Sequence, residues 1–178
     1  MTARQQLERI YDTYAEVLFQ YFRARTRSCE QARDLLQDLF VRLGAGSAAA
    51  ALGDGVQNEK AWLFTIARNL VIDHARSADA RQRKVHALEN EMSATGFFAP
   101  SPDPDLARLR EDLSAALLAL PEPQRIVVYL RLIAGLTFEE IATAEEIPSN
   151  TAVSRYRYGI DKLQAALGPV YSEFSIDP

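Results

Sequence analysis

The sequence predicts an all-α protein: two small helical domains joined by a Pro-rich linker, the C-terminal one a helix-turn-helix. Apolar residues recur every three or four positions over most of the 178 residues, which is typical of amphipathic helices. No alternating pattern of useful length indicates a strand. Residues 93–105, SATGFFAPSPDPD, hold three prolines without helical periodicity and divide the chain in two.

Two helices are predicted before residue 45. The first carries an apolar stripe of Leu7, Ile10, Tyr14, Val17, Leu18 and Tyr21. The second begins near Ser28, which forms a capping-box pattern with Gln31, and ends at Gly44 and Gly46. Its stripe is Ala32, Leu35, Leu36, Leu39, Phe40 and Leu43.

A glycine- and alanine-rich loop is predicted over 44–57, followed by a long helix over 59–84 that Asn58 can cap. We expect the core face of this helix to consist of Trp62, Ile66 and Leu70, with Leu63 and Val71 as further candidates. The domains are predicted at 1–90 and 108–170, with a linker at 91–107 and a tail at 171–178. Phe97 and Phe98 are unusual in a free linker, which favours their docking on a domain.

The second domain is predicted to hold four helices. Pro121 and Pro123 suit a helix start, and Gly135 suits the end of the same helix. Thr137 can cap a helix of about nine residues, and Ile147-Pro148 turns the chain into the last helix. A short helix, a turn and a second helix form the helix-turn-helix arrangement. Its turn holds Glu146, where a left-handed backbone would cost about 1 kcal/mol.

The last helix is predicted to separate an apolar face from a polar one. The expected core arc is Val153, Tyr156, Ile160, Leu163 and Leu167. The polar side holds Ser149, Asn150, Thr151, Ser154, Tyr158 and Asp161, flanked by Arg155, Arg157 and Lys162. Free N–H groups at a helix start favour phosphate, and Asn, Ser, Thr and Arg can bond base edges. The alternative interpretation is a solvated helix in a small bundle.

The helix over 59–84 carries a second polar line. Asn69, Asp73 and Arg76 are spaced by four and three, so they share a face near Arg68. Six basic residues against two acidic ones give 60–84 a net charge of +4, although the whole chain has −4. The pattern fits a nucleic-acid surface in which Asn reads bases and Arg holds phosphates. A solvated face with an Asp73–Arg76 pair is the alternative.

Composition argues against other classes. No stretch of 18 apolar residues and no apolar signal-peptide core are present, and Cys29 is a single cysteine. These features fit the cytoplasm and no membrane insertion. His74 and His86 belong to no triad or metal-ligand cluster, and no phosphate-binding glycine motif occurs. We therefore expect no enzyme, no metal and no cofactor.

Three segments in order resemble the extracytoplasmic-function (ECF) group of the sigma-70 family of bacterial RNA polymerase sigma factors. They are ARDLLQDLFVRL, AWLFTIARNLVIDHAR and LPEPQRIVVYLRLIAGLTFEEIA with IPSNTAVSRYRYGIDKL. The resemblance covers about residues 8–77 and 106–168. It implies a factor that binds core RNA polymerase and directs promoter recognition and melting.

The resemblance also implies residue roles. Contacts with polymerase, at its β′ clamp helices, fall on Asp34, Leu35, Gln37, Asp38 and Phe40, although the leucine and Phe40 also suit a core. Contacts with the −10 element fall on Lys60, Trp62, Arg68, Asn69, Asp73 and Arg76. Contacts with the −35 element fall on Ser149, Asn150, Thr151, Ser154, Arg155, Arg157 and Tyr158.

The implied partners are the β and β′ subunits of core polymerase and promoter DNA, with an anti-sigma protein as a further candidate. The chain departs from the family pattern at Glu146, where many members have glycine, and at 159–161, where many are more basic. The loop at 44–57 also differs, which affects its expected base pocket. Two alternatives stay open. One is a helix-turn-helix regulator that binds DNA as a dimer and is not a sigma factor. The other is a relative that binds polymerase without activating transcription.

Overall fold

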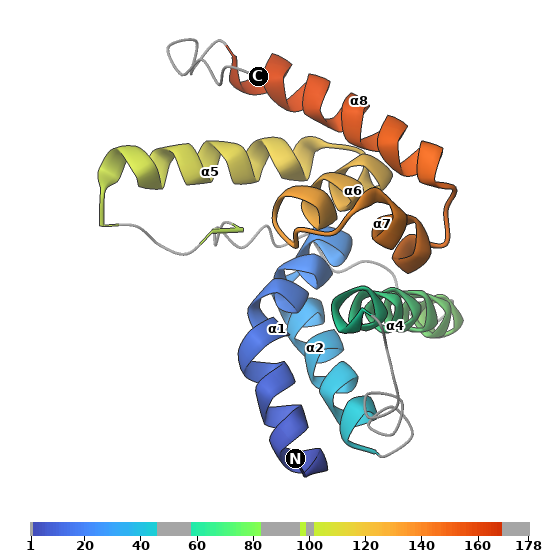
Figure 1. Ribbon diagram of the computed structural model, residues 1–178. Helices are drawn as coiled ribbons and strands as arrows, with labels where there is room; N and C mark the ends of the chain where they lie inside the picture. The colour runs from blue at the N-terminus through green and yellow to red at the C-terminus, as the bar shows by residue number, and fades with distance from the viewer. Residues whose placement is uncertain (1, 46–57, 83–96, 99–101, 169–178) are drawn as a thin grey trace.

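The computed structural model describes residues 2–45, 58–82, 97–98 and 102–168 (Figure 1). Every regular element within these ranges is a helix, which confirms the predicted all-α class. The helices are α1 (Ala3–Thr26), α2 (Cys29–Gly44), α4 (Glu59–Gln82), α5 (Pro104–Ala119), α6 (Glu122–Leu132), α7 (Phe138–Glu145) and α8 (Ser149–Leu167). None of these helices is both long and apolar enough to cross a membrane. Most of the loop at 44–57 and of the linker, and the whole tail at 171–178, lie outside the described residues.

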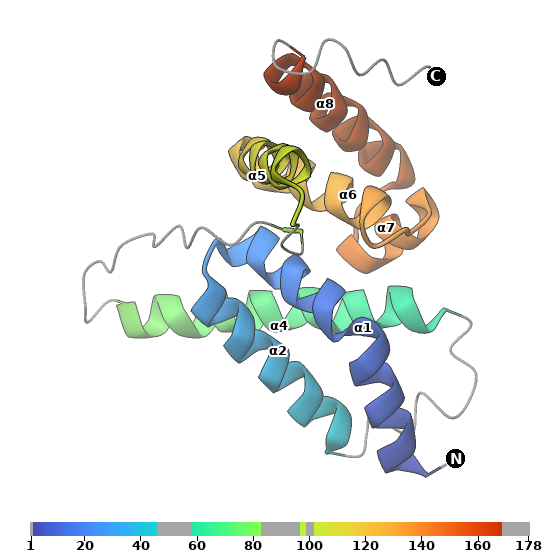
Figure 2. The ribbon, with the colours of Figure 1, turned by 90° about the vertical axis from the view of Figure 1, so that its left-hand side faces the viewer.

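The N-terminal domain consists of a helix pair, α1 and α2, with α4 lying across it (Figure 2). Side-chain caps set the helix starts. The Thr2 hydroxyl accepts a hydrogen bond from the Gln5 N–H at 3.3 Å, and Ser28 Oγ accepts one from the Gln31 N–H at 3.3 Å. Both predicted apolar stripes face inward, and Ile10, Leu18, Tyr21, Ala32, Leu35, Leu39 and Leu43 are buried.

The predicted cap of α4 is confirmed, and its predicted core face is partly right, because Leu63 and Leu70 are buried. Asn58 Oδ1 accepts a hydrogen bond from the Ala61 N–H at 3.0 Å. The buried side chains are those of Ala61, Leu63, Phe64, Ala67 and Leu70, whereas Trp62 and Ile66 are only half-buried. Apolar residues surround the first half of α4, so periodicity does not select one arc. Packing against α1, α2 and α7 determines which residues of α4 are buried.

The C-terminal domain consists of α5, α6, α7 and α8. Pro121 precedes α6, and Gly135, with φ +70°, follows its end, as predicted. Thr137 caps α7 in a full capping box with Glu140. Glu146 has φ 52° and ψ 47°, so the turn takes the left-handed conformation that costs a non-glycine residue about 1 kcal/mol.

The predicted core arc of α8 is partly right: Leu163 is buried and Tyr156 and Ile160 pack against the core, but Val153 does not. Val153 is 45% exposed, and the buried residues are Ala152, Gly159 and Leu163. Gly159 lets α8 approach α6 closely, because a Cβ on this residue would lie 2.6 Å from Val128 Cγ2. A glycine adds no apolar side chain to the pattern, so periodicity placed the arc on Val153 instead.

The two domains pack against each other in one continuous core. α6 packs on α1, and α7 packs on α4 (Figure 1). Tyr129 of α6 is buried and donates a hydrogen bond to the Val17 carbonyl at 2.7 Å. Phe97 docks as expected: it is 5% exposed, lies under the Arg23 guanidinium at 5.3 Å, and donates its N–H to Ser114 Oγ at 3.0 Å.

Candidate nucleic-acid and protein interfaces

The outer face of α2 presents charged and apolar groups together. Asp34, Gln37 and Asp38 are exposed, Phe40 is half-buried, and Leu35 is 1% exposed. The structure therefore places Leu35 in the core, where it cannot contact a partner. This follows from its place in the apolar stripe that fixes α2 on α1.

An open groove of about 420 Å³ lies beside these residues, between α1 and α2. Its lining includes Tyr11, Arg33, Leu36, Gln37, Phe40 and Val41. Tyr11 and Val41 are 53% and 62% exposed, and the Tyr11 and Phe40 rings lie 4.9 Å apart. Sequence reasoning missed both exposed residues. A signal existed, because each is apolar yet falls outside the stripe of its own helix.

The polar line of α4 is solvent-facing. Asn69, Asp73 and Arg76 are exposed on one face, as their spacing predicted. Asp73 pairs with Arg42 of α2 at 3.3 Å rather than with Arg76. Because both side chains of this pair are about half-exposed, it contributes little to stability. Trp62 is half-buried near the start of the helix.

Two basic residues of α4 face the C-terminal domain instead of solvent. Arg68 Nη1 lies 2.9 Å from Glu146 Oε2 and 3.4 Å from Asn69 Oδ1. The Arg68 side chain is only 18% exposed, whereas that of Glu146 is 61% exposed. Lys60 Nζ lies 3.6 Å from where a Cβ on Gly135 would be. Among the residues predicted to bind the −10 element, the contact between the domains therefore covers Arg68 and Lys60 and leaves Asn69, Asp73 and Arg76 exposed.

The N-terminus of α8 is open. Ser149 and Asn150 are exposed, and Thr151, Ser154 and Arg155 are half-buried. No side chain caps this end of the helix, because Pro148 occupies the N-cap position. The first-turn N–H groups and the positive end of the helix dipole can therefore receive an anion such as phosphate.

The second turn of α8 continues this polar surface. Ser154 Oγ donates a hydrogen bond to the Thr151 carbonyl at 3.0 Å. Arg157 and Tyr158 are exposed, and the guanidinium of Arg157 lies 5.2 Å from the Tyr158 ring centroid. Val153 belongs to the same exposed side, where an apolar group can contact a thymine methyl.

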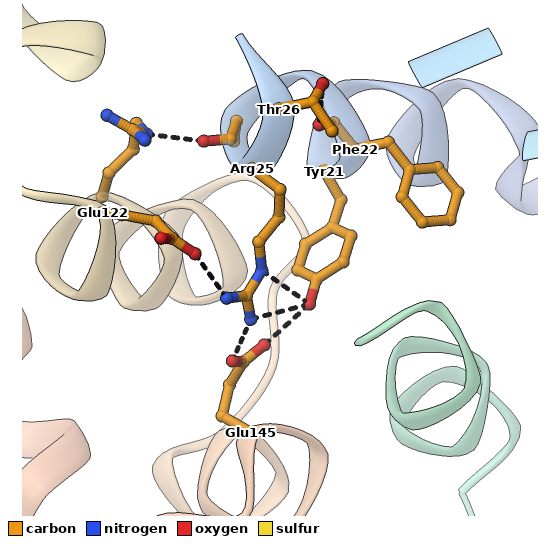
Figure 3. A network of polar contacts seen from close by, with 8 residues as sticks. Tyr21, Phe22, Arg25, Thr26, Glu122 and Glu145 are labelled. Carbon is orange, nitrogen blue, oxygen red and sulfur yellow. Dashed lines mark hydrogen bonds and ion pairs between the residues drawn. The ribbon is translucent and has the colours of Figure 1, made fainter. Parts of the chain in front are cut away.

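A buried polar network joins the two domains behind these surfaces (Figure 3). Tyr21 Oη donates a hydrogen bond to Glu145 at 2.9 Å and accepts from Arg25 at 3.0 and 3.1 Å. Arg25 also pairs with Glu145 and, at 2.7 Å, with Glu122. Burial, reinforced by the Glu145 carboxylate, raises the pKa of Tyr21 well above its usual range. Burial alone lowers the pKa of Arg25, but Tyr21 and Glu145 outweigh it and the pKa is raised.

Sequence reasoning did not find this network. One signal was available, because Arg25 lies four residues after Tyr21, on the side of α1 that the apolar stripe marks as buried. A charged residue on such a face needs a buried partner. The partner, Glu145, lies 120 residues away, and local pattern gives no means of identifying it.

Comparison with known proteins finds one family match in each half of the chain. Residues 10–81 match the family model described as Sigma-70 region 2, and residues 110–163 match Sigma-70, region 4. The ECF RNA polymerase sigma factor SigL of Mycobacterium tuberculosis is 32% identical over 158 residues, covering 89% of this chain and 86% of SigL. SigX of Bacillus subtilis, also an ECF RNA polymerase sigma factor, is 28% identical over 159 residues, covering 87% and 80%.

A solved structure shares the fold. It is the sigma factor RpoE in complex with the anti-sigma factor NepR from Bartonella quintana. The TM-score is 0.70 at 23% sequence identity, with 92% of this chain and 97% of the other covered.

Proposed function

The chain belongs to the ECF group of the sigma-70 family, and from this premise we propose how it recruits core RNA polymerase and reads promoter DNA. It acts by binding, in the cytoplasm and without covalent chemistry of its own. Two surfaces read DNA and a third binds the enzyme. The observation that carries this proposal is the uncapped, polar N-terminus of α8 in a helix-turn-helix, on a chain that matches both family regions.

The α2 surface binds polymerase. Asp34, Gln37 and Asp38 are exposed, and the groove lined by Tyr11, Phe40 and Val41 lies beside them. Acidic groups around an apolar patch suit a protein partner, because the patch supplies buried area and the charges supply orientation. The partner is the β′ subunit at its clamp helices. An anti-sigma protein stays a predicted partner of this chain.

The exposed part of α4 reads and opens the −10 element. Asn69 offers an amide to an unpaired base edge, and Arg76 offers a guanidinium to the backbone. Arg68 and Lys60 add two more cations once they are uncovered. Trp62 is half-buried and supplies an aromatic face on which a base can stack.

The start of α8 reads the −35 element in the major groove. The first-turn N–H groups with Ser149 and Thr151 hold the backbone, and Asn150, Ser154 and Arg155 face bases. Arg157 and Tyr158 extend the contact to the flanking phosphate. A dimeric regulator is not favoured, because the homology extends over both sigma regions and not only over the helix-turn-helix.

Run-off transcription with purified core polymerase, followed by sequencing of transcript 5′ ends, tests the function. We expect promoter-specific starts only when the chain is present. Arg155→Ala should lower the use of a −35-dependent promoter by about 1–3 kcal/mol, or about 5- to 150-fold. Lys162→Ala removes a cation farther along the same helix and should have little effect on the use of that promoter. Equal losses in both variants would contradict the assigned reading surface.

A second test separates binding from melting. Asn69→Ala should reduce promoter opening, measured by permanganate reactivity, more than it reduces the initial binding measured by gel shift. His74→Ala on the exposed side of the same helix is the matched control. Open complexes that form as well in Asn69→Ala as in the unchanged chain would refute this role.

A further inference from the structure

The first two turns of α8 expose an aliphatic side chain among polar ones. Val153 is 45% exposed and does not pack against the core. The buried residues of α8 are Ala152, Gly159 and Leu163, and the helix lies at the outer edge of the C-terminal domain (Figure 1). Val153 therefore contributes little to the packing of its own domain, and its exposure calls for another reason.

The neighbours of Val153 on the helix surface are suited to DNA. Asn150, Val153 and Arg157 are spaced by three and four, so they lie in one line along α8. Asn150 and Arg157 are exposed, and the half-buried Ser154 lies beside this line. The first acidic residue of α8 is Asp161, about two turns beyond Val153. A nonpolar group between amide, hydroxyl and guanidinium groups suits a DNA groove better than an apolar protein partner.

The β-branched side chain of Val153 is ordered before any partner binds. In a helix, valine takes one χ1 rotamer in about 90% of cases, because its two γ-carbons crowd the preceding turn. Contact with a partner therefore costs little conformational entropy, in contrast to contact through a long side chain such as arginine. Val153 thus offers two γ-methyl groups as a fixed apolar surface.

One base presents a matching apolar group in the major groove. Thymine carries its C5-methyl there, whereas adenine and cytosine present an amino group that an aliphatic side chain cannot bond. Burial of one methyl-sized group between the two surfaces corresponds to about 4-fold in affinity. Val153 is therefore suited to select thymine over the other bases.

The position of that thymine follows from helix geometry. A rise of about 1.5 Å per residue separates Asn150 from Val153 by about 4.5 Å along the axis of α8. Base pairs follow one another at about 3.4 Å along the duplex. The amide of Asn150 suits adenine, so the thymine should lie within about two base pairs of that adenine.

We propose that Val153 is a specificity-determining residue, which selects a thymine of the −35 element by contact with its C5-methyl group, close to an adenine bound by Asn150. This proposal rests on the proposed function, because it requires that α8 reads the −35 element. It adds a base preference to a surface whose other members act through hydrogen bonds and charge.

Removal of single methyl groups from the promoter tests this contact. The probe is a duplex promoter found by the transcript-start sequencing described above, and competition gel shift measures its binding to core polymerase carrying the chain. Each thymine of the −35 element, on either strand, is replaced in turn by deoxyuridine, which lacks only the methyl group. We expect one position at which deoxyuridine weakens binding by about 4-fold. In Val153→Ala, which lacks both γ-methyl groups, the same replacement should have little effect.

Two further variants separate base contact from a structural effect. Leu132→Ala truncates another exposed aliphatic side chain, 57% exposed at the end of α6, and should keep the full response to deoxyuridine. Val153→Thr keeps the β-branch and one methyl group, so it should retain part of the response. Helix content measured by circular dichroism should be the same in all three variants, because both substituted residues are exposed.

A full response to deoxyuridine in Val153→Ala would overturn the proposal, as would a −35 element without any sensitive thymine. Weaker binding of Val153→Ala to polymerase in the absence of DNA, with the deoxyuridine response unchanged, would assign Val153 to a protein contact instead. Asn150→Ala should lose its preference for adenine within about two base pairs of the sensitive thymine, and a larger separation would contradict the assigned geometry. If the unchanged chain directs no promoter-specific transcription, the proposed function itself fails.

Discussion

At the scale of single residues, Glu146 combines an unfavourable backbone with a favourable ion pair. The left-handed conformation costs about 1 kcal/mol for a non-glycine residue, and an exposed pair such as Glu146–Arg68 contributes about 0–1 kcal/mol. Glu146→Gly relieves the strain and loses the pair, whereas Glu146→Gln loses the pair alone. We expect the glycine variant to be about 1 kcal/mol more stable than the glutamine variant in urea denaturation. A glycine variant that is the less stable of the two would contradict this assignment of strain.

Gly159 determines how closely α8 approaches α6. Gly159→Ala places a methyl group 2.6 Å from Val128 Cγ2, and overpacking typically costs about 1–3 kcal/mol, against a helix-propensity gain of about 1 kcal/mol. We expect a net loss of about 1 kcal/mol in urea denaturation. Adding Val128→Ala makes room for the methyl, so the double variant should be more stable than the sum of the single effects predicts. Strict additivity would show that the two side chains do not clash.

The residues of the candidate site were predictable to the extent that their positions follow from local spacing. Asn69, Asp73 and Arg76 share an exposed face of α4 because spacing by four and three dictates it. Val153 was assigned to the core and is exposed, because sequence cannot show that Gly159 is the residue of α8 that lies against Val128 of α6. Arg68 was assigned to solvent-facing DNA contact and is covered, because its partner belongs to a distant helix.

At the scale of helices, Arg125 joins the ends of two of them. It is 2% exposed and donates to the carbonyls of Ala24 at 2.6 Å, Leu118 at 3.1 Å and Leu120 at 2.9 Å. Helix ends leave carbonyls without backbone partners, and a buried carbonyl needs a donor. Arg125 supplies that donor to α1 and α5 from the first turns of α6.

We expect Arg125→Leu to destabilise the protein by about 3 kcal/mol or more, because it leaves buried carbonyls without their donor. Arg108→Leu, at an exposed position of α5, should change stability by no more than about 0.5 kcal/mol. Urea denaturation of both variants measures the difference. Similar small losses would mean that water replaces the guanidinium.

Helix boundaries were predictable where a cap is encoded nearby. The side chains of Asn58, Thr137 and Ser28 each accept a hydrogen bond from the N–H three residues later. A few neighbouring residues are therefore enough to predict where these helices begin. The face that a helix buries has a different origin. α4 is apolar on several sides, and only its neighbours α1, α2 and α7 determine that Phe64 and Ala67 are buried while Trp62 is partly open.

At the scale of the whole molecule, the domain contact depends on buried tyrosines. Tyr21 and Tyr129 have their ring centroids 6.5 Å apart across it, and both are about 1% exposed or less. The contact was not predictable, because each tyrosine also fits the core of its own helix and only the assembled structure joins the two cores. The proline-rich segment indicated two domains correctly and carried no information on whether they touch.

These tyrosines make the contact sensitive to alkali. Burial raises the pKa of both above the ordinary value of 10.0, with Glu145 adding to the effect at Tyr21 and Glu16 at Tyr129. Above about pH 10, tyrosines of the unfolded chain release protons that the folded chain retains. The contribution of these tyrosines to the free energy of unfolding is therefore fully present below about pH 10. It falls as pH rises further, by up to about 1.4 kcal/mol per pH unit for each tyrosine.

Arg125 acts in the opposite direction. Burial lowers its pKa to about 10, and the nearby Arg27 adds to this, so above pH 10 the unfolded chain binds more protons at this residue. It opposes the tyrosines, which outnumber it because the pKa of Tyr14 is raised as well, so urea unfolding measured from pH 8 to 11 should show a stability that is flat below about pH 10 and falls above it. Tyr129→Phe should make that fall shallower, whereas Phe22→Leu should lower the whole curve and leave the slope above pH 10 unchanged. A Tyr129→Phe variant that keeps the full slope would show that the contact does not depend on this protonated tyrosine.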